Sequence, residues 1–181
     1  MLSIKINEQD LLRAKNLLAH IPKAYNQAVK SALGRTLESM RTEAVKKTSE
    51  LYNIKSSVVR KSFQLEKSRG LLISRGPRLK IVDYKFTPNR PRAKNYMGAV
   101  RKNGLKNFPS AFIIRQGGAQ KAYPYIRVGK KRWDIKAIFS PAVPQILQNP
   151  ETISAIEEKA GEVFSQRLNH EVMRALGVFA K

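Results

Sequence analysis

Histidine and cysteine, the side chains that most often act as catalytic bases and nucleophiles, are almost absent from this sequence. Cysteine does not occur, which excludes disulfides, thiolate zinc sites and cysteine nucleophiles. The two histidines are His20, at a junction between expected helices, and His170, near the end of the last expected helix. Neither accompanies an acid and a nucleophile in a catalytic pattern, so both are interpreted as surface or interface residues.

Carboxylates are too dispersed for metal-dependent cleavage of a nucleic acid. Two-metal phosphoryl chemistry needs clustered carboxylates to hold its cations. Between residues 51 and 136 the acids are Glu66, Asp83 and Asp134. A denser acidic group at positions 157–162 fits the solvated first half of a helix, where the helix dipole favours negative charge. We therefore expect no metal site, no cofactor and no enzymatic activity.

Basic side chains are concentrated in the middle of the chain. The 181 residues include 35 Lys+Arg and 13 Asp+Glu, a formal net charge of +22. Residues 51–136 hold 22 basic and 3 acidic side chains, a net charge of +19, whereas the segments before and after carry +4 and −1. Phosphate, an anionic lipid surface, an acidic protein or counterions alone would neutralise such a field. A segment with so large an excess of basic residues favours a polyanion or an acidic protein as the partner.

Thirteen basic residues of this block are candidate contacts to nucleic acid or to an acidic partner. They are Arg75, Arg78, Lys80, Arg90, Arg92, Lys94, Arg101, Lys102, Lys106, Arg127, Lys130, Lys131 and Arg132. Aromatic residues alternate with some of them, as at positions 84–86 and 123–133, and such mixing suits phosphate contacts combined with base stacking. Aromatic residues that alternate along strands more often pack in a core, so core packing is favoured. No DNA-recognition helix, zinc finger or RNA-binding signature is present, so any nucleic-acid contact is expected to be independent of sequence.

Secretion and membrane insertion are not expected. Residues 1–10 alternate in polarity and carry two acids, unlike a signal peptide. The apolar runs are only a few residues long, far short of the roughly 18–20 needed to span a bilayer. We expect a soluble protein made in the cytoplasm, without a membrane partner.

Long helices are predicted at the N-terminal end of the chain. After a short alternating strand at residues 2–6, apolar periodicity predicts a helix over 8–19 and a second from Pro22 to about Glu50. The second helix would be about 45 Å long, so we expect it to carry subunit contacts or to contain a break. Gly34 lies inside it and is interpreted as a site of close packing rather than as a hinge.

The C-terminal third is predicted to be helical as well. Asn149, Pro150 and an acid in the first turn are a start signal, and the apolar stripe ends at Gly177. Five residues of the long helices are candidate positions for an oligomer interface. They are Tyr25, Leu37, Met40, Phe164 and Leu168.

The middle of the chain is predicted to form β-strands. Six segments show a period of two residues or similar strand character, and the first three of them are expected to form an antiparallel meander. They are residues 63–67, 71–74, 79–86, 97–100, 111–115 and 123–128. A short basic helix at 58–63, with Ser56 and Ser57 as candidate caps, precedes them. Residues 87–96 contain two prolines, three basic residues and few apolar side chains, which predicts a mobile loop or arm.

These elements predict an α+β fold in a single domain, residues 1–181. Residues 1–63 are mainly helical, and residues 137–181 form a C-terminal helical region. Between them, residues 64–136 form a strongly basic antiparallel β region with the loop near 87–96.

Several segments, in the same order over most of the chain, resemble the minor tail protein Z family of lambda-type phages and prophages. They are residues 32–45, 52–55, 58–61, 111–115, 138–147 and 149–151, with a terminal helix ending near 168–172. The resemblance is weakest over residues 64–108. The sequence departs from the family pattern at residues 116–125, so the resemblance does not support the hairpin expected there.

The resemblance implies a structural virion protein and not an enzyme. The implied role is that of a tail completion protein. A protein of this kind acts at the head-proximal end of a long tail, where it is needed for head–tail joining and for positioning the DNA end. It implies a homo-oligomeric ring, commonly sixfold, and contacts with tail terminator, tail tube and head connector proteins and with the end of the phage DNA. It also implies a place in the virion after assembly in the host cytoplasm. The alternative is a free-standing protein that binds nucleic acid without sequence preference.

Overall fold

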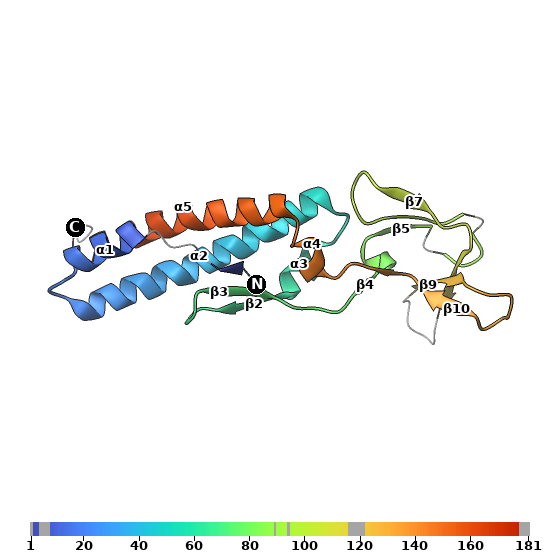
Figure 1. Cartoon of the computed structure of the whole chain (residues 1–181), viewed down its shortest axis with the longest axis horizontal. Coiled ribbons are helices and arrows are strands. Elements are labelled where there is room, and N and C mark those ends of the chain that lie inside the picture. Colours follow the sequence, from blue (N-terminus) through green and yellow to red (C-terminus); the bar gives the residue numbers. More distant parts are fainter. Residues whose placement is uncertain (1, 4–7, 89, 94, 116–121, 178–181) are drawn as a thin grey trace. The chain divides into compact units, whose positions relative to one another are not determined.

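The structure, a computed structural model, has both helices and small antiparallel sheets, which confirms the predicted α+β class (Figure 1). The residues that it describes are 2–3, 8–88, 90–93, 95–115 and 122–177. The description below applies to these residues.

The chain forms two compact units, each assembled from separated segments. The first, called the helical unit, contains residues 1–45, 63–75 and 147–181. The second, called the β unit, contains residues 46–62 and 76–146. Each unit is considered by itself, and the single domain expected from the sequence stays a prediction.

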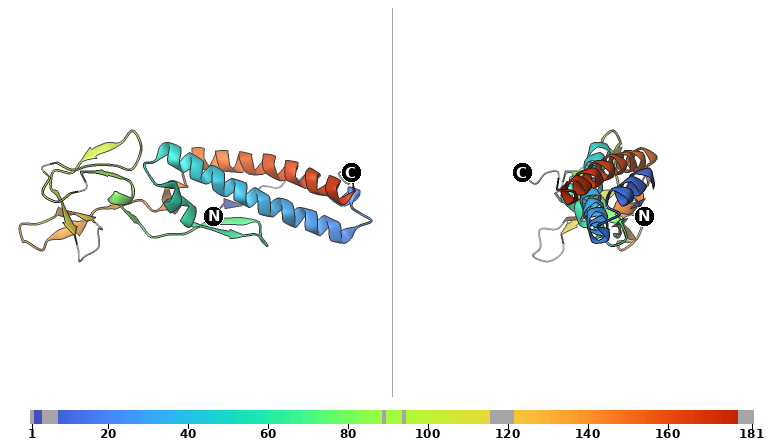
Figure 2. Two further views of the ribbon diagram at one scale, coloured as in Figure 1. Left: turned by 180° about the vertical axis from the view of Figure 1, so that it is seen from behind. Right: turned by 90° about the vertical axis from the view of Figure 1, so that its left-hand side faces the viewer.

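Three helices dominate the helical unit and lie side by side (Figures 1 and 2). They are α1 (Glu8–Leu17), α2 (Pro22–Leu51), of which residues 22–45 belong to this unit, and α5 (Pro150–Ala175). Their shared apolar core contains seven buried side chains. These are Ala14, Leu18, Ala28, Ala32, Phe164, Leu168 and Val172. The apolar spacing of three and four residues therefore buries one face of each helix in the same core.

The ends of α5 follow the sequence signals. The side chain of Asn149 accepts a hydrogen bond from the backbone N–H of Glu151 at 3.3 Å, and Pro150 occupies the first turn. At the other end, Gly177 has a φ of +77°, a left-handed conformation that glycine adopts without steric cost. The predicted limits of this helix are confirmed.

Helix α2 runs for 30 residues without a break. At Gly34, an added Cβ would lie 3.9 Å from the side chain of Lys67 and would meet nothing closer among the described residues. The interpretation of Gly34 as a site of close packing was therefore wrong, and so was the alternative of a break in the helix. The absence of a Cβ here leaves open space beside α2.

A small sheet completes the helical unit. Strands β2 (Phe63–Glu66) and β3 (Leu71–Ser74) form the predicted antiparallel hairpin, and β1 (Leu2–Ser3) pairs with the other edge of β3. Gly70 turns the chain before β3 with a φ of +65°. The rest of the predicted first strand lies outside the described residues.

The β unit contains eight short strands in three sheets. They are β4 (Leu79–Lys80), β5 (Lys85–Thr87), β6 (Met97–Ala99), β7 (Leu105–Asn107), β8 (Ala111–Arg115), β9 (Ala122–Arg127), β10 (Ile135–Ala137) and β11 (Phe139–Ser140). The sheet orders are β5-β6-β7, β10-β9-β8 and β11-β4, and every pairing is antiparallel. Two short helices, α3 (Ser56–Lys61) and α4 (Val143–Ile146), belong to the same unit.

The predicted third strand of the meander was wrong. Residues 79–86 do not continue from β3 as one strand, because a 3-10 turn at Ile81–Asp83 divides them. The carboxylate of Asp83 accepts the backbone N–H of Lys80 at 3.0 Å and holds this turn. The predicted caps of the short basic helix were also wrong, since the residue before α3 is Lys55 and it makes no side-chain cap.

Aromatic and aliphatic side chains together form the core of the β unit. Phe86 stacks on Tyr96 with ring centroids 5.6 Å apart, and Phe108 contacts Phe86 at 6.1 Å. Gly98 of β6 allows this packing, because a Cβ there would meet the rings of Phe108 and Phe86 and the side chain of Ile81 at 2.9–3.2 Å. The middle of the chain therefore has an apolar core of its own.

The segment 87–96, predicted to be a mobile loop or arm, is anchored at one end. Tyr96 is 1% exposed, and its hydroxyl donates to the carbonyl of Arg90 at 2.9 Å and accepts the N–H of Ala93 at 3.3 Å. Arg90 and Arg92 are exposed, whereas the predicted contact residue Lys94 lies outside the described residues. The loop is therefore fixed to the β unit through Tyr96.

Candidate polyanion-binding site

The thirteen basic residues expected to meet an anion are not all in one place. Arg75 belongs to the helical unit, and eleven of the others belong to the described part of the β unit. Of these eleven, Lys80 is half-buried and the rest are exposed. The structure divides most of them between a groove and a hairpin tip.

Arg78, Arg101 and Lys106 line the same groove, a cavity of about 730 Å³ in the β unit. Arg78 precedes β4, Arg101 follows β6, and Lys106 is the central residue of β7. None of the residues that line the groove is acidic. Three positive charges from separated parts of the sequence therefore meet in a groove without a carboxylate to neutralise them.

The backbone around Arg101 is held firmly. Tyr52 and Arg101 form an isolated antiparallel bridge, and the amide of Asn53 donates to the carbonyls of Arg101 and Ala99 at 3.0 and 3.3 Å. The guanidinium of Arg101 lies 5.9 Å from the centre of the Tyr52 ring. Residues that directly follow helix α2 therefore position a cation of the groove.

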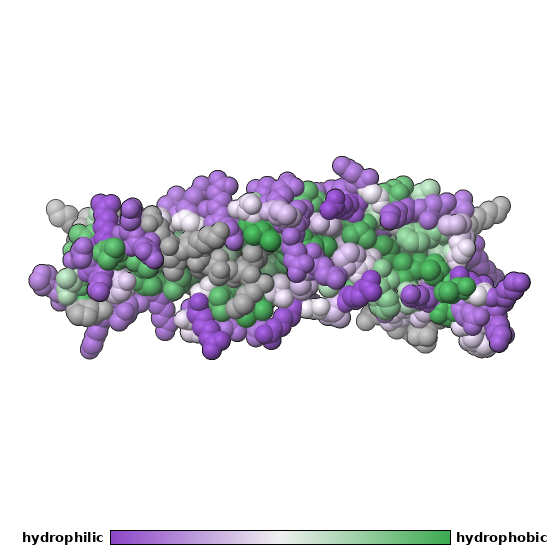
Figure 3. All heavy atoms as spheres, in the orientation of Figure 1, coloured by the Kyte–Doolittle hydropathy of each residue, from purple (hydrophilic) through white to green (hydrophobic). Residues whose placement is uncertain are grey.

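The remaining wall of the groove is largely apolar. It includes the buried Ile81 and Ile138, the half-buried Phe108 and the exposed Phe139. Figure 3 shows hydrophobic residues among hydrophilic ones at the surface of this unit. Ser140 also lines the groove, and its Oγ is buried without a hydrogen-bond partner among the described residues. Apolar walls strengthen the attraction between the three cations and an anion, because they lower the local dielectric.

Tyr84 supports the wall without adding a negative charge. Its hydroxyl donates to the carbonyl of Pro141 at 2.8 Å. Burial is the main cause that raises the pKa of Tyr84 to about 12, and the charges of Tyr52 and Asp83 contribute to the same rise. The phenol therefore stays neutral throughout the physiological range.

The hairpin that joins β9 to β10 carries the second group of cations. Arg127 reaches across the loop, where its guanidinium donates to the carbonyls of Lys131 and Arg132 at 3.4 and 3.5 Å. Lys130, Lys131 and Arg132 are exposed around the tip. Gly129 lets the carboxylate of Asp134 approach the loop backbone, since a Cβ there would overlap it. The tip is therefore an ordered basic hairpin.

Trp133 is 78% exposed beside these cations, with the Arg132 guanidinium 5.3 Å from its ring centre. The expectation that the aromatics interleaved with basic residues pack in the core is confirmed for Tyr84, Phe86 and Tyr96. It is wrong for Trp133. An exposed indole among cations is suited to stacking on a base.

Two further cations of the set also lie over aromatic rings. The Lys80 ammonium lies 3.5 Å from the centre of the Tyr123 ring, and the Arg127 guanidinium lies 5.5 Å from that of Phe112. Both rings lie on the paired strands β8 and β9. These two cations therefore help to hold the β unit together as well as adding to its charge.

The few acids of the β unit are all engaged. Its segments hold 21 basic and 3 acidic residues, a net charge of +18. Glu50 pairs with Lys47 at 3.4 Å, Asp83 accepts the Lys80 N–H, and Asp134 packs against Gly129. The exposed cations of the groove and the tip therefore keep their positive field.

The five residues proposed for an oligomer interface lie in the helical unit. Leu37, Met40, Phe164 and Leu168 are at most 1% exposed, and Tyr25 is half-buried. The stripe that suggested an interface is accounted for by packing within one chain. Self-association stays a prediction, and it requires other, exposed residues.

The chain has few features that point to other functions. In the described ranges, no group of three His, Cys, Asp or Glu residues could hold a metal ion. No helix among the described residues is both long enough and apolar enough to pass through a bilayer.

Sequence reasoning missed several residues of the groove. Tyr52 and Ser140 are far from the basic residues in the sequence, and Phe139 lies in a two-residue strand that was not predicted. Strand β7, which carries Lys106, was not predicted either. The groove depends on pairings between distant segments, for which periodicity gives no signal.

Comparison with known families yields one match. Residues 4–181 match the family described as prophage minor tail protein Z (GPZ). Neither the curated proteins nor the solved structures contain a match.

Proposed function

The chain belongs to the prophage minor tail protein Z family and is a structural component of a phage tail, and we propose that it completes the head-proximal end of that tail. In this role it joins the tail to the head and holds the end of the DNA. It acts as a homo-oligomeric ring, commonly sixfold, beside the tail terminator, the tail tube and the head connector. The ring is part of the virion and is assembled in the host cytoplasm.

The observation that carries the DNA contact is the groove of the β unit. It brings Arg78, Arg101 and Lys106 together without an acid, in a unit with a net charge of +18. Phosphates are the anions that such a field attracts regardless of sequence. Contacts to the phosphate backbone would hold a DNA end without reading its sequence.

The hairpin tip adds a second contact of the same kind. Lys130, Lys131 and Arg132 are exposed there, and Trp133 offers a flat apolar surface beside them. Phosphates would meet the cations, while an unpaired base at a DNA end would stack on the indole. The tip also favours the alternative, a free-standing nucleic-acid-binding protein, so the two functions need a test that separates them.

Tails made without this chain separate the two functions. If the chain completes the tail, such tails should fail to join heads in a mixing assay, and adding the purified chain should restore joining. Normal joining without it would contradict the proposal and leave the alternative.

The role of the groove is tested by removing its charges. The variant Arg78→Gln/Arg101→Gln/Lys106→Gln should bind duplex DNA more weakly, and the slope of log K against log salt should fall by roughly 2–3, at about 0.9 per lost phosphate contact. The matched control Arg13→Gln/Lys15→Gln/Lys23→Gln removes the same charge from exposed positions of the helical unit. Its slope should change by less than about 1. Equal losses in both variants would show that total charge, and not the groove, binds DNA.

A further inference from the structure

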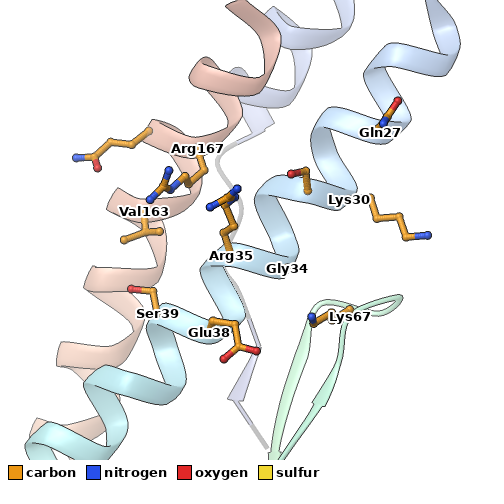
Figure 4. A pocket seen from close by; sticks show the side chains of 11 residues that line it. Gln27, Lys30, Gly34, Arg35, Glu38, Ser39, Lys67, Val163 and Arg167 are labelled. Atoms are coloured by element: carbon orange, nitrogen blue, oxygen red, sulfur yellow. The ribbon is translucent and has the colours of Figure 1, made fainter. Parts of the chain in front are cut away.

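A second basic groove lies in the helical unit, outside the block that the sequence singled out. It is a cavity of about 710 Å³ lined by residues of α2, of α5 and of the turn between β2 and β3 (Figure 4). Its cations are Lys30 and Arg35 from α2, Lys67 from the turn and Arg167 from α5, and all four are exposed. Figure 4 shows the side chains of Arg35 and Arg167 extending toward each other from the two helices.

The structure gives these cations no ion pair with any residue that it describes. Among the described residues that line the groove, Glu38 is the one carboxylate, and it pairs with Arg41. Within the described residues, neither Arg35 nor Arg167 forms an ion pair. Gly34 lines the same groove. Because glycine has no side chain, the groove stays open at this position. Like charges that converge in a groove repel unless an anion enters between them.

The same two helices carry the opposite charge farther along their length. Glu151, Glu158 and Glu162 of α5 are exposed, and their spacing of seven and four residues places them on one helical face. The hydrogen bond that Lys159 donates to Glu162 raises the pKa of Lys159, and the charges of Glu162, Glu43 and Glu158 raise it further. Glu43 of α2 therefore lies near the same acidic surface.

We infer that the basic groove of one copy receives the acidic face of α5 from a neighbouring copy. The contact joins two different surfaces, so it is heterologous, and such a contact builds a ring when the rotation between copies closes on itself. This inference rests on the proposed function, because it specifies the interface of the proposed ring. It also replaces the buried residues of the helical core as the site of self-association.

A second copy fits the groove better than DNA does. Glu38 lines the groove and Glu43 lies five residues farther along α2, so a phosphate backbone that follows the helix would meet carboxylates. The segments of the helical unit hold 14 basic and 10 acidic residues, a net charge of +4, whereas those of the β unit carry +18. Neighbouring β units repel each other, so attraction between copies must come from the helical unit.

Charge reversal on both sides tests the pairing. Sedimentation velocity of the full chain should show that Arg35→Glu/Arg167→Glu weakens self-association at least tenfold, and so should Glu158→Arg/Glu162→Arg. A chain with all four changes should regain association to within about threefold, since complementary charges are restored. The control Arg13→Glu/Lys23→Glu makes the same change of charge elsewhere on the helical unit. When this control is combined with the two changes in α5, self-association should not recover. Failure of the fourfold variant to recover would overturn the inference.

Cross-linking in assembled tails provides a test that does not depend on charge. The chain has no cysteine, so single cysteines can be placed without background. Tails that contain one tagged copy with Arg35→Cys and a differently tagged copy with Glu158→Cys should yield a heterodimer with a short bismaleimide. Copies with Lys23→Cys in place of Arg35→Cys should not. Tails that join heads normally without this cross-link would refute the interface alone, whereas joining without the chain would refute the proposed function.

Discussion

The helical unit and the β unit differ more in charge than in size. The helical unit has 10 acidic and 14 basic residues, which is a near balance, and its core is formed by three helices. The β unit holds 21 bases and 3 acids on sheets of two or three strands. Surface charge of one sign destabilises a compact state through self-repulsion. The comparison teaches that one unit is built for packing and the other for attracting an anion.

The aromatic residues show the same division. In the β unit, Phe86 and Tyr96 stack in a small core, while Lys80 and Arg127 lie over aromatic rings. Cation–π contacts let a surface of high positive charge contribute to packing. In the described part of the helical unit, aliphatic side chains and Phe164 fill the core without such contacts. A substitution should therefore affect stability or anion binding according to the unit in which it lies.

The largest expected effect is in the core of the helical unit. Phe164 is 1% exposed at the centre of the cluster formed by α1, α2 and α5, and Phe164→Ala should lower the free energy of unfolding by about 3–5 kcal/mol. Urea unfolding followed by circular dichroism measures this loss. The DNA affinity of the folded fraction should stay unchanged. A parallel loss of DNA affinity would show that the two units do not divide stability and binding between them.

A smaller effect is expected from Tyr84 at high pH. Its pKa is raised to about 12 in the folded chain, above the ordinary value of 10.0, so folding favours the neutral phenol. The corresponding stability is present below pH 10 and is lost as the pH rises toward 12, by up to about 2.7 kcal/mol for a shift of two units. Tyr84→Phe should show a shallower loss of stability between pH 10 and 12, measured by urea unfolding. Equal slopes in the two proteins would contradict this role of Tyr84.

Trp133 should affect binding without affecting stability. Trp133→Ala should weaken binding to single-stranded DNA by at least about 1 kcal/mol, because an exposed indole is available to stack on a base. Its unfolding free energy should change by less than about 0.5 kcal/mol, as for other exposed positions. Fluorescence anisotropy with a labelled oligonucleotide measures the first quantity. Trp133→Phe, which keeps an aromatic face, should retain most of the affinity.

The smallest effect is expected at Gly34, where the sign is the informative result. Gly34→Ala should raise the unfolding free energy by about 0.5–1 kcal/mol, because alanine favours a helix and the added Cβ meets no close atom among the described residues. Thermal unfolding would show the increase. A decrease would mean that the groove beside Gly34 needs the space, as it would if a partner enters it.

The sequence predicted the helices well because their signals are local. Asn149, Pro150 and Gly177 mark the ends of α5 whatever the chain folds against, and the apolar periodicity of α2 is independent of its neighbours. The third strand of the meander failed for a physical reason. Its alternation was real, but Asp83 bonds to the backbone of Lys80 and turns the chain.

The sites were less predictable than the helices. Composition located the basic block, yet Arg78, Arg101 and Lys106 meet through strand pairings that no periodicity encodes. Arg35 and Arg167 line one groove although they are 132 residues apart in the sequence. The segments that contain them have nearly equal numbers of acidic and basic residues. Charge counted along the sequence finds a region with an excess, whereas a groove requires contacts between distant segments.

The order in which the segments of the helical unit leave the ribosome has a consequence for assembly. Residues 52–62 and 76–146 of the β unit are synthesised between α2 and α5, so the apolar face of α2 is complete long before α5 exists to cover it. The core that contains Ala28 and Ala32 is shared by α1, α2 and α5. Until α5 is made, α1 is the one other helix of this core against which they can pack. Such a chain exposes apolar surface during synthesis and depends on late, long-range closure. A nascent chain that stops before Pro150 should therefore bind chaperones, and release of the complete chain would coincide with the docking of α5.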